Sequence, residues 1–305
     1  MIIANPIYDV VFKRMMENER VARFFIGTLL EENIETVELR PQELTYTDER
    51  SALSVFRLDF VATIKTEGGE YKKVLIEIQK ARNHIDLMRF RNYLAEQYKK
   101  EDVVNDKKAI LPITTIYILG FKLPEIETPC IKVERNYRDR VNKTILPVKS
   151  DFVEKLTHDS FIVQVQRITD RYQTSLDKLL SVFEQRNFVD DQKIIKEFNH
   201  TADLEELKII TDILHHAGTN PSEKKRIETE KEAWRTVNAM FEEEREAFEE
   251  EREAFEEERE DFLKVLKEKN QAISEKDQAL SEKEQALSEK DKLIAELLRK
   301  LDEKK

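Results

Sequence analysis

Three residues with oxygen donors stand inside otherwise apolar stretches of the sequence: Asp59, Glu77 and Gln79. Carboxylate and amide oxygens are the ligands to which hard cations such as Mg²⁺ bind. Two neighbouring carboxylates repel each other, and a cation between them relieves that repulsion. These residue types therefore predict a divalent-metal site, provided that the fold brings the three side chains together.

A β-hairpin would bring them together. Residues 55–65 and 71–79 are rich in apolar and β-branched side chains, and Glu67-Gly68-Gly69 separates the two runs. This is the pattern of two antiparallel strands joined by a short turn.

The length of the turn sets the register of the two strands. With three loop residues, Thr66 pairs with Glu70, and continuing the pairing along both strands places Asp59 directly opposite Glu77. Their Cβ atoms are then about 4.5–5.5 Å apart. Side chains alternate between the faces of a strand, so Asp59, Glu77 and Gln79 share one face. The opposite face carries large apolar side chains: Phe56, Leu58, Phe60, Val74, Ile76 and Ile78.

A second interpretation treats Asp59 and Glu77 as ordinary surface acids. If this face were exposed on an edge hairpin, both carboxylates would be solvated, and exposed acids are far commoner than buried ones. The apolar density of LDFVATI and VLIEI instead favours inner strands that are covered on both faces.

The pattern around the hairpin is typical of an α/β fold. Residues 8–30, introduced by Asn5-Pro6, and residues 85–100 have the three- and four-residue apolar spacings of helices. Residues 113–121 have the composition of a buried strand. The predicted order is therefore helix, hairpin, helix and strand.

The second half of the chain has a different character. Residues 151–214 predict mostly helix, with strand-like character at 160–165, and Gly218-Thr219-Asn220-Pro221 marks a boundary loop. We therefore expect three parts: a core over residues 1–150, a mainly helical extension over 151–232, and a separate segment over 233–305.

The last segment is built from seven-residue repeats, first FEEEREA from residue 241 and then SEKDQAL-like units from residue 274. The pattern predicts a helix from about residue 233 to 305, on the order of 100 Å long. It is either a coiled coil that joins copies of the chain or a single helix with charged pairs along its surface. Each heptad holds about one apolar residue on the seam. If the phenylalanines occupy the d positions, the later leucines and isoleucines occupy the a positions without a break in register: Phe241, Phe248, Phe255, Phe262, then Leu266, Ile273, Leu280, Leu287, Ile294 and Leu301.

The charge of the chain is unevenly distributed. The formal net charge is −11, but residues 241–305 hold 23 acidic and 14 basic residues, a net of −9. The other 240 residues hold 40 acidic and 38 basic residues, a net of −2, so the body is close to neutral and can still present a basic face to DNA. The absence of a long apolar run and of a signal-peptide pattern predicts a protein that is neither membrane-spanning nor exported. The single cysteine, Cys130, fits a reducing cytoplasm.

Four segments together resemble a known family. FRLDFVATI (residues 56–64) followed by VLIEIQKA (residues 74–81) is similar to the Asp…Glu-x-Gln form of the PD-(D/E)XK nuclease signature. The opening NPIYDVVFKRMM and the later KLTHDSFIVQ resemble the recombination-promoting nuclease/putative transposase (Rpn) group of that superfamily. The resemblance covers roughly residues 5–215.

The resemblance implies a restriction-endonuclease-like core of helix, three strands, helix and strand, with one strand within residues 35–46. It also implies hydrolysis of DNA phosphodiester bonds with Mg²⁺ or another divalent cation held by Asp59 and Glu77. Gln79 replaces the lysine of most members, and an amide supplies no positive charge. Lys80 is adjacent in sequence, but alternation points it to the other face unless the strand ends there.

Two further places could contribute to such a site. Asp9 matches an acidic position of the family that can add a metal ligand; the competing interpretation is a surface acid near a helix N-terminus, where negative charge is favourable. Arg89, Tyr93 and Gln97 share a helix face and could contact phosphate, although a solvated face is the simpler interpretation.

Two functions of different class follow from these observations. The first is an active DNA endonuclease that serves recombination, element mobility or defence against foreign DNA. The second is an inactive nuclease-fold protein that binds partners and assembles through its C-terminal helix. Both Asp59 and Glu77 are present in the sequence, which favours the endonuclease.

Overall fold

The computed structural model describes the backbone of residues 1–47, 54–80 and 84–302; the side chains of residues 40–59 and of a few positions elsewhere lie outside the described set. The chain divides into two compact units, Met1–Thr236 and Val237–Lys305. Among the described residues, no helix is both long enough and apolar enough to cross a membrane.

A mixed six-stranded sheet forms the centre of the first unit. In spatial order its strands are β2 (Ile34–Thr47), β3 (Ser54–Thr66), β4 (Tyr71–Gln79), β7 (Ile113–Leu119), β9 (His158–Gln164) and β8 (Cys130–Val133). β4 pairs antiparallel with β3 and parallel with β7, so it lies inside the sheet. The α/β class predicted from the sequence is confirmed, and β2 supplies the expected strand before the hairpin.

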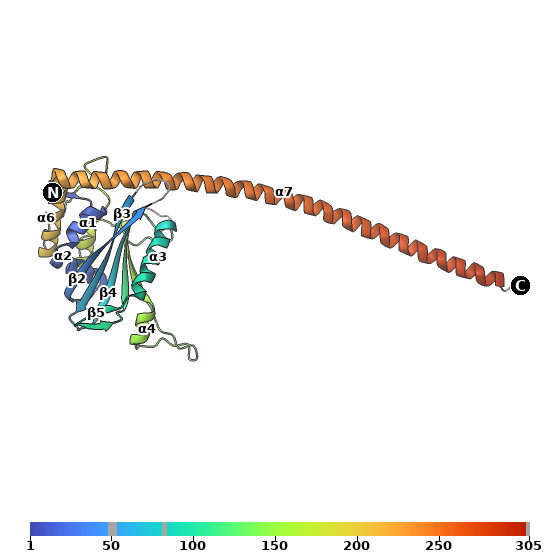
Figure 1. Ribbon diagram of the computed structural model, residues 1–305, viewed down its shortest axis with the longest axis horizontal. Coiled ribbons are helices and arrows are strands. Elements are labelled where there is room, and N and C mark those ends of the chain that lie inside the picture. Colours follow the sequence, from blue (N-terminus) through green and yellow to red (C-terminus); the bar gives the residue numbers. More distant parts are fainter. Residues whose placement is uncertain (48–53, 81–83, 303–305) are drawn as a thin grey trace. The chain divides into compact units, whose positions relative to one another are not determined.

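Helices cover both faces of this sheet (Figure 1). Ile76 of β4 belongs to a large buried cluster that includes Phe12, whereas the neighbouring Leu75 belongs to a smaller cluster on the other face with Phe90. The helices of the first face are α1 (Asp9–Met16), α2 (Glu19–Leu30) and α6 (Glu205–Thr219), and the helix of the second face is α3 (His84–Lys99).

The hairpin has the predicted register. The backbone N–H of Thr66 donates to the Glu70 carbonyl at 2.9 Å, and Gly69 adopts φ +82°, a left-handed conformation that favours glycine. The β3–β4 pairing continues to the pair Phe60 and Ile76. The observed pairing ends there, one residue before Asp59, so the predicted pair of Asp59 with Glu77 remains a prediction.

The helix predicted over residues 8–30 is two helices, so that prediction is wrong in detail. α1 ends at Met16 and α2 begins at Glu19. Between them the Asn18 side chain accepts a hydrogen bond from the Val21 N–H at 3.1 Å and so caps α2. The apolar spacing continues across the break because both helices bury side chains in one cluster.

The mainly helical extension predicted from residue 151 is also corrected. β9 lies inside the sheet, parallel to β7 and antiparallel to β8. Helices α4 (Asp151–Leu156) and α5 (Ser175–Ser181) are short, and β10 (Ile195–Glu197) pairs with β1 (Ile2–Ala4) at the start of the chain. The sheet thus continues across the predicted boundary at residue 150.

The second unit is part of one long helix. α7 runs from Pro221 to Asp302, so the helix predicted from about residue 233 begins earlier. The break before it is Asn220 alone, whose side chain accepts from the N–H groups of Ser222 and Glu223 at 2.9 and 3.2 Å. Residues 237–302 span about 100 Å at 1.5 Å per residue. Their described apolar side chains are exposed, including Phe255 and Phe262.

Candidate active site

β4 carries two of the three predicted donors into the interior. Glu77 is 1% exposed and Gln79 is 9% exposed. Leu75, two residues before Glu77 on the same face, packs against Phe90 and Tyr93 of α3. By alternation the side chains of Glu77 and Gln79 therefore lie on the α3 face of an inner strand. The alternative of solvated surface acids is wrong for Glu77.

Asp59 belongs to β3, next to Phe60, which pairs with Ile76. Its backbone pairs with Gln42 of β2, and the predicted position opposite Glu77 lies one residue beyond the last β3–β4 pair. The side chain of Asp59 lies outside the described residues, so a pair of carboxylates between β3 and β4 remains a prediction.

Lys80 follows the last residue of β4, Gln79, and its ammonium group lies in a cluster on the α1 face. The Lys80 Nζ is 3.6 Å from the Asp9 Oδ2 and forms an ion pair with Glu230 of α7. It lies 4.8 Å from the ring centre of Trp234 and 5.2 Å from that of Tyr8. Burial and the charge of Glu230 raise the pKa of the Tyr8 hydroxyl, so this group stays protonated.

Glu230 also contacts the backbone at the start of α1. Its two carboxylate oxygens accept hydrogen bonds from the N–H groups of Asp9 and Val10, at 2.8 and 3.0 Å. These N–H groups have no partners within the helix, and the positive end of the helix dipole favours a carboxylate there. We refer to Tyr8, Asp9, Lys80, Glu230 and Trp234 as the α1 cluster.

The structure therefore separates the predicted residues into two groups. Glu77 and Gln79 point to the α3 face, whereas Asp9 contacts Lys80 in the α1 cluster. The role of Asp9 as a metal ligand beside Glu77 remains a prediction. In the described part of the structure, the cation next to Asp9 is Lys80. The sequence analysis missed Glu230, because nothing in the pattern of α7 distinguishes it from the other acids of that helix.

The predicted phosphate-contacting face of α3 is corrected. Tyr93 and Gln97 are only 6% and 3% exposed, and Tyr93 packs against Val61 and Ile113 of the sheet. This face of α3 is thus neither solvated nor available to DNA. The side chain of Arg89 lies outside the described residues, and Arg91 is exposed.

A buried lysine that the sequence analysis also missed lies on the same face of β4 as Glu77. Lys73 is 2% exposed, and its Nζ is 2.8 Å from an Asp102 carboxylate oxygen and 3.4 Å from the Gln97 carbonyl. These contacts tie β4 to α3 and to the strand β5 (Asp102–Val104). These contacts therefore explain the burial of Lys73 without a role in the candidate site.

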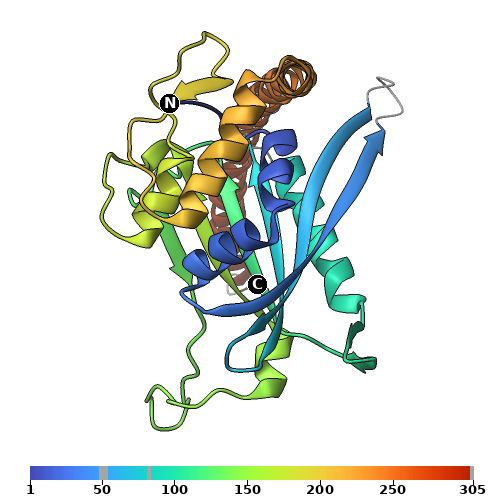
Figure 2. The same cartoon turned by 90° about the vertical axis from the view of Figure 1, so that its left-hand side faces the viewer.

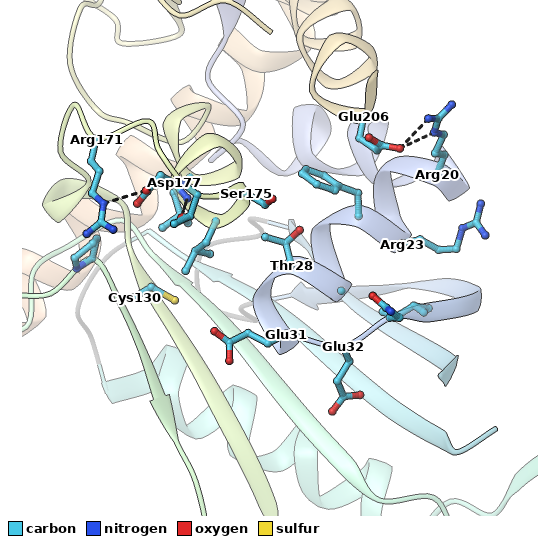
Figure 3. Close-up of a pocket in the computed structure, with 18 of the residues that line it drawn as sticks. Arg20, Arg23, Thr28, Glu31, Glu32, Cys130, Arg171, Ser175, Asp177 and Glu206 are labelled. Atoms are coloured by element: carbon cyan, nitrogen blue, oxygen red, sulfur yellow. Dashed lines mark hydrogen bonds and ion pairs between the residues drawn. The ribbon is translucent and has the colours of Figure 1, made fainter. Parts of the chain in front are cut away.

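A cavity of about 910 Å³ opens elsewhere, between α2, α5 and the strand β8 (Figure 3). Its three arginines are already paired: Arg20 with Glu206 at 2.8 Å, Arg23 with Glu19 at 3.9 Å and Arg171 with Asp177 at 3.0 Å. Burial raises the pKa of Cys130 on its wall to about 11, so the thiol is a poor nucleophile near neutral pH. None of the predicted site residues lines this cavity.

The donors on the α3 face fit a hard cation by their chemistry. Glu77 supplies a carboxylate and Gln79 an amide oxygen, and Mg²⁺ is commonly held by one or two carboxylates while keeping several waters. Within residues 1–47, 54–80 and 84–302, the described side chains include no group of three or more His, Cys, Asp or Glu placed to hold a metal. A complete site therefore depends on Asp59.

Comparisons with protein-family models, curated proteins and solved structures found no match to this chain.

Proposed function

We propose that this protein is a divalent-metal-dependent DNA endonuclease of the PD-(D/E)XK type, related to the Rpn group. The observation that carries the proposal is the burial of Glu77 and Gln79 on the α3 face of the inner strand β4. The neighbouring strand β3 holds Asp59, and we propose that its carboxylate faces Glu77. Glu77 places a buried carboxylate on an inner strand, and carboxylates are ligands that hold a divalent cation in proteins.

Asp59 and Glu77 would hold the metal, and Gln79 would orient the attacking water or the phosphate through its amide. When bound, the cation polarises the phosphoryl oxygen and lowers the pKa of water. The hydrolysis would form one P–O bond from water and break one P–O ester bond, with one water proton passing to the leaving alkoxide and the other to solvent. Lys80 contacts Asp9 and Glu230 on the α1 face, which favours Gln79 over Lys80 in the third position.

The direct test is incubation of the purified full chain with supercoiled plasmid, with Mg²⁺ and with a chelator. We expect nicked or linear DNA with Mg²⁺ and none with the chelator. If no cleavage occurs with Mg²⁺ or Mn²⁺, the alternative gains support: an inactive nuclease-fold protein that assembles through its C-terminal helix.

A further inference from the structure

Residues 137–149 form an arm that leaves the sheet between β8 and α4 (Figure 2). The arm is a short two-stranded ribbon, because the Asp139 N–H donates to the Thr144 carbonyl at 2.9 Å and the Leu146 N–H donates to the Tyr137 carbonyl at 2.8 Å. An isolated antiparallel bridge joins Arg138 and Ile145. The arm thus has a defined backbone.

The arm concentrates positive charge. Residues 137–149 hold four basic residues and one acidic residue, in a body whose net charge outside the tail is close to zero. Arg138, Arg140 and Lys143 are exposed, and no described side chain forms an ion pair with any of them. Their charges are therefore available to a partner.

The single acid of the arm is engaged within the turn. The Asp139 carboxylate accepts hydrogen bonds from the Val141 N–H at 2.7 Å and from the Asn142 side chain at 2.7 Å. These bonds lower the pKa of Asp139 and shape the tip of the ribbon. Asp139 thus fixes the turn that presents the three cations.

The arm and the candidate active site lie at opposite ends of the sheet. α4 leads into His158, which is level with Ile113 and Lys73, whereas the proposed metal ligand Glu77 is level with Tyr117. Four residues of strand separate these levels, about 13 Å at 3.3 Å per residue. The arm is therefore placed to hold a duplex roughly four or more base pairs away from the bond that is cut.

We propose that residues 137–149 are a DNA-binding arm in which Arg138, Arg140 and Lys143 contact the phosphates of a duplex. This inference rests on the proposed function, since it assigns the substrate-holding surface of the same enzyme. Phosphate contacts from Arg and Lys hold a protein on a duplex without reading its sequence. An anionic lipid surface is the competing partner because four large apolar side chains of the arm are exposed: Val141, Ile145, Leu146 and Val148. DNA is favoured because the three exposed cations lie together within residues 138–143 and DNA is the substrate of the proposed function.

The test is fluorescence anisotropy of a 30-base-pair duplex with the full chain in a chelator, so that no cleavage occurs. The variant is Arg138→Gln/Arg140→Gln/Lys143→Gln. The matched control, Lys122→Gln/Lys208→Gln/Lys225→Gln, removes the same charge from exposed positions elsewhere. Circular dichroism and melting confirm that both proteins are folded.

We expect the arm variant to raise the Kd at least about 10-fold and to reduce the slope of log K against log salt by roughly 2–3, one unit or slightly less per lost phosphate contact. The control should bind within about twofold of the wild type. Equal effects in the arm variant and the control would overturn the inference.

Two further results separate this inference from the proposed function. If the wild type binds DNA through the arm but does not cut plasmid, the DNA-binding arm is supported and the proposed endonuclease activity is rejected. A wild type that binds phosphatidylserine/phosphatidylcholine vesicles and no DNA rejects the DNA-binding arm in favour of a lipid surface.

Discussion

Glu77 is the residue on which the proposed chemistry depends. Its side chain is 1% exposed on an inner strand, and the neighbours on its face include the apolar Leu75 and Phe90. Surroundings of low polarity strengthen the attraction between a carboxylate and a cation, because water screens it less. The same surroundings would make a metal site at Glu77 sensitive to any loss of its second carboxylate.

A second buried charge gives a prediction about pH. Lys196 of β10 is 1% exposed and donates to the carbonyls of Ser181 and Glu184 at 3.3 and 2.6 Å. Burial lowers its pKa from 10.5 to about 7. Between these pH values the unfolded chain binds more protons than the folded chain, so this group makes stability rise with pH there, by up to about 1.4 kcal/mol per unit.

Urea unfolding at pH 7 and at pH 9 measures this effect. The stability of the wild type relative to Lys196→Met should increase by roughly 2 kcal/mol over that range. The exposed Lys208→Met serves as the control and should follow the wild type. Parallel pH profiles for wild type and Lys196→Met would show that Lys196 is charged in the folded protein.

The positions of Glu77 and Gln79 could be predicted from the sequence because strand alternation and a three-residue turn are local properties. The contact of Lys80 with Glu230 could not, because the two residues are 150 positions apart and the acids of α7 resemble one another. Tyr93 and Gln97 were placed on one helix face, but only the packing of α3 shows that this face is buried.

At the scale of elements, Glu230 joins the first turns of α7 to the start of α1. Its carboxylate accepts from two backbone N–H groups and pairs with Lys80. Removing the Glu230 carboxylate takes this partner away from the Lys80 ammonium group and from the N–H groups of Asp9 and Val10, all of which lie where water reaches poorly. Glu230→Ala should therefore lower the free energy of unfolding by roughly 2–4 kcal/mol.

The neighbouring exposed Glu232→Ala is the matched control, and it should change stability by less than about 0.5 kcal/mol. Trp234 is the only tryptophan of the chain and is 6% exposed, so its fluorescence reports release of this part of α7. A red shift in Glu230→Ala and none in Glu232→Ala is expected. Identical stability and fluorescence in both variants would mean that Glu230 does not fasten the helix.

Elements set by local patterns were easier to predict than elements set by distant pairing. The hairpin, α3, β7 and the long α7 follow from apolar spacing and turn residues. β10 is three residues long and pairs with β1, which is distant in the sequence. β8 likewise pairs with the later strand β9. Such short strands have no periodicity of their own, so the sequence placed β10 in a mostly helical region and predicted no strand at β8.

At the scale of the whole molecule, the two units are expected to have different tasks. The segment 241–305 carries 23 acidic and 14 basic residues, and excess negative charge repels DNA. Its exposed apolar residues, such as Ile273 and Leu280, suit association of copies of the chain. Self-association would bring two of the proposed nuclease sites together and favour double-strand breaks.

Deleting residues 241–305 keeps Glu230 and Trp234 and should leave the first unit folded. We expect a lower mass by light scattering and an unchanged DNA affinity at moderate salt. An unchanged mass would reject association through the tail, and a large loss of affinity would reject the electrostatic argument.

The measurement that tests the central proposal most directly is plasmid cleavage with Mg²⁺ by Asp59→Ala and Glu77→Ala, with melting recorded on the same samples. Loss of a metal ligand should reduce cleavage at least about 100-fold, while the proteins stay folded. Glu77→Gln, which keeps the volume of the buried side chain, should lose activity equally if Glu77→Ala proves unstable. Cleavage close to that of the wild type by a stably folded Asp59→Ala or Glu77→Gln protein would contradict the proposed active site.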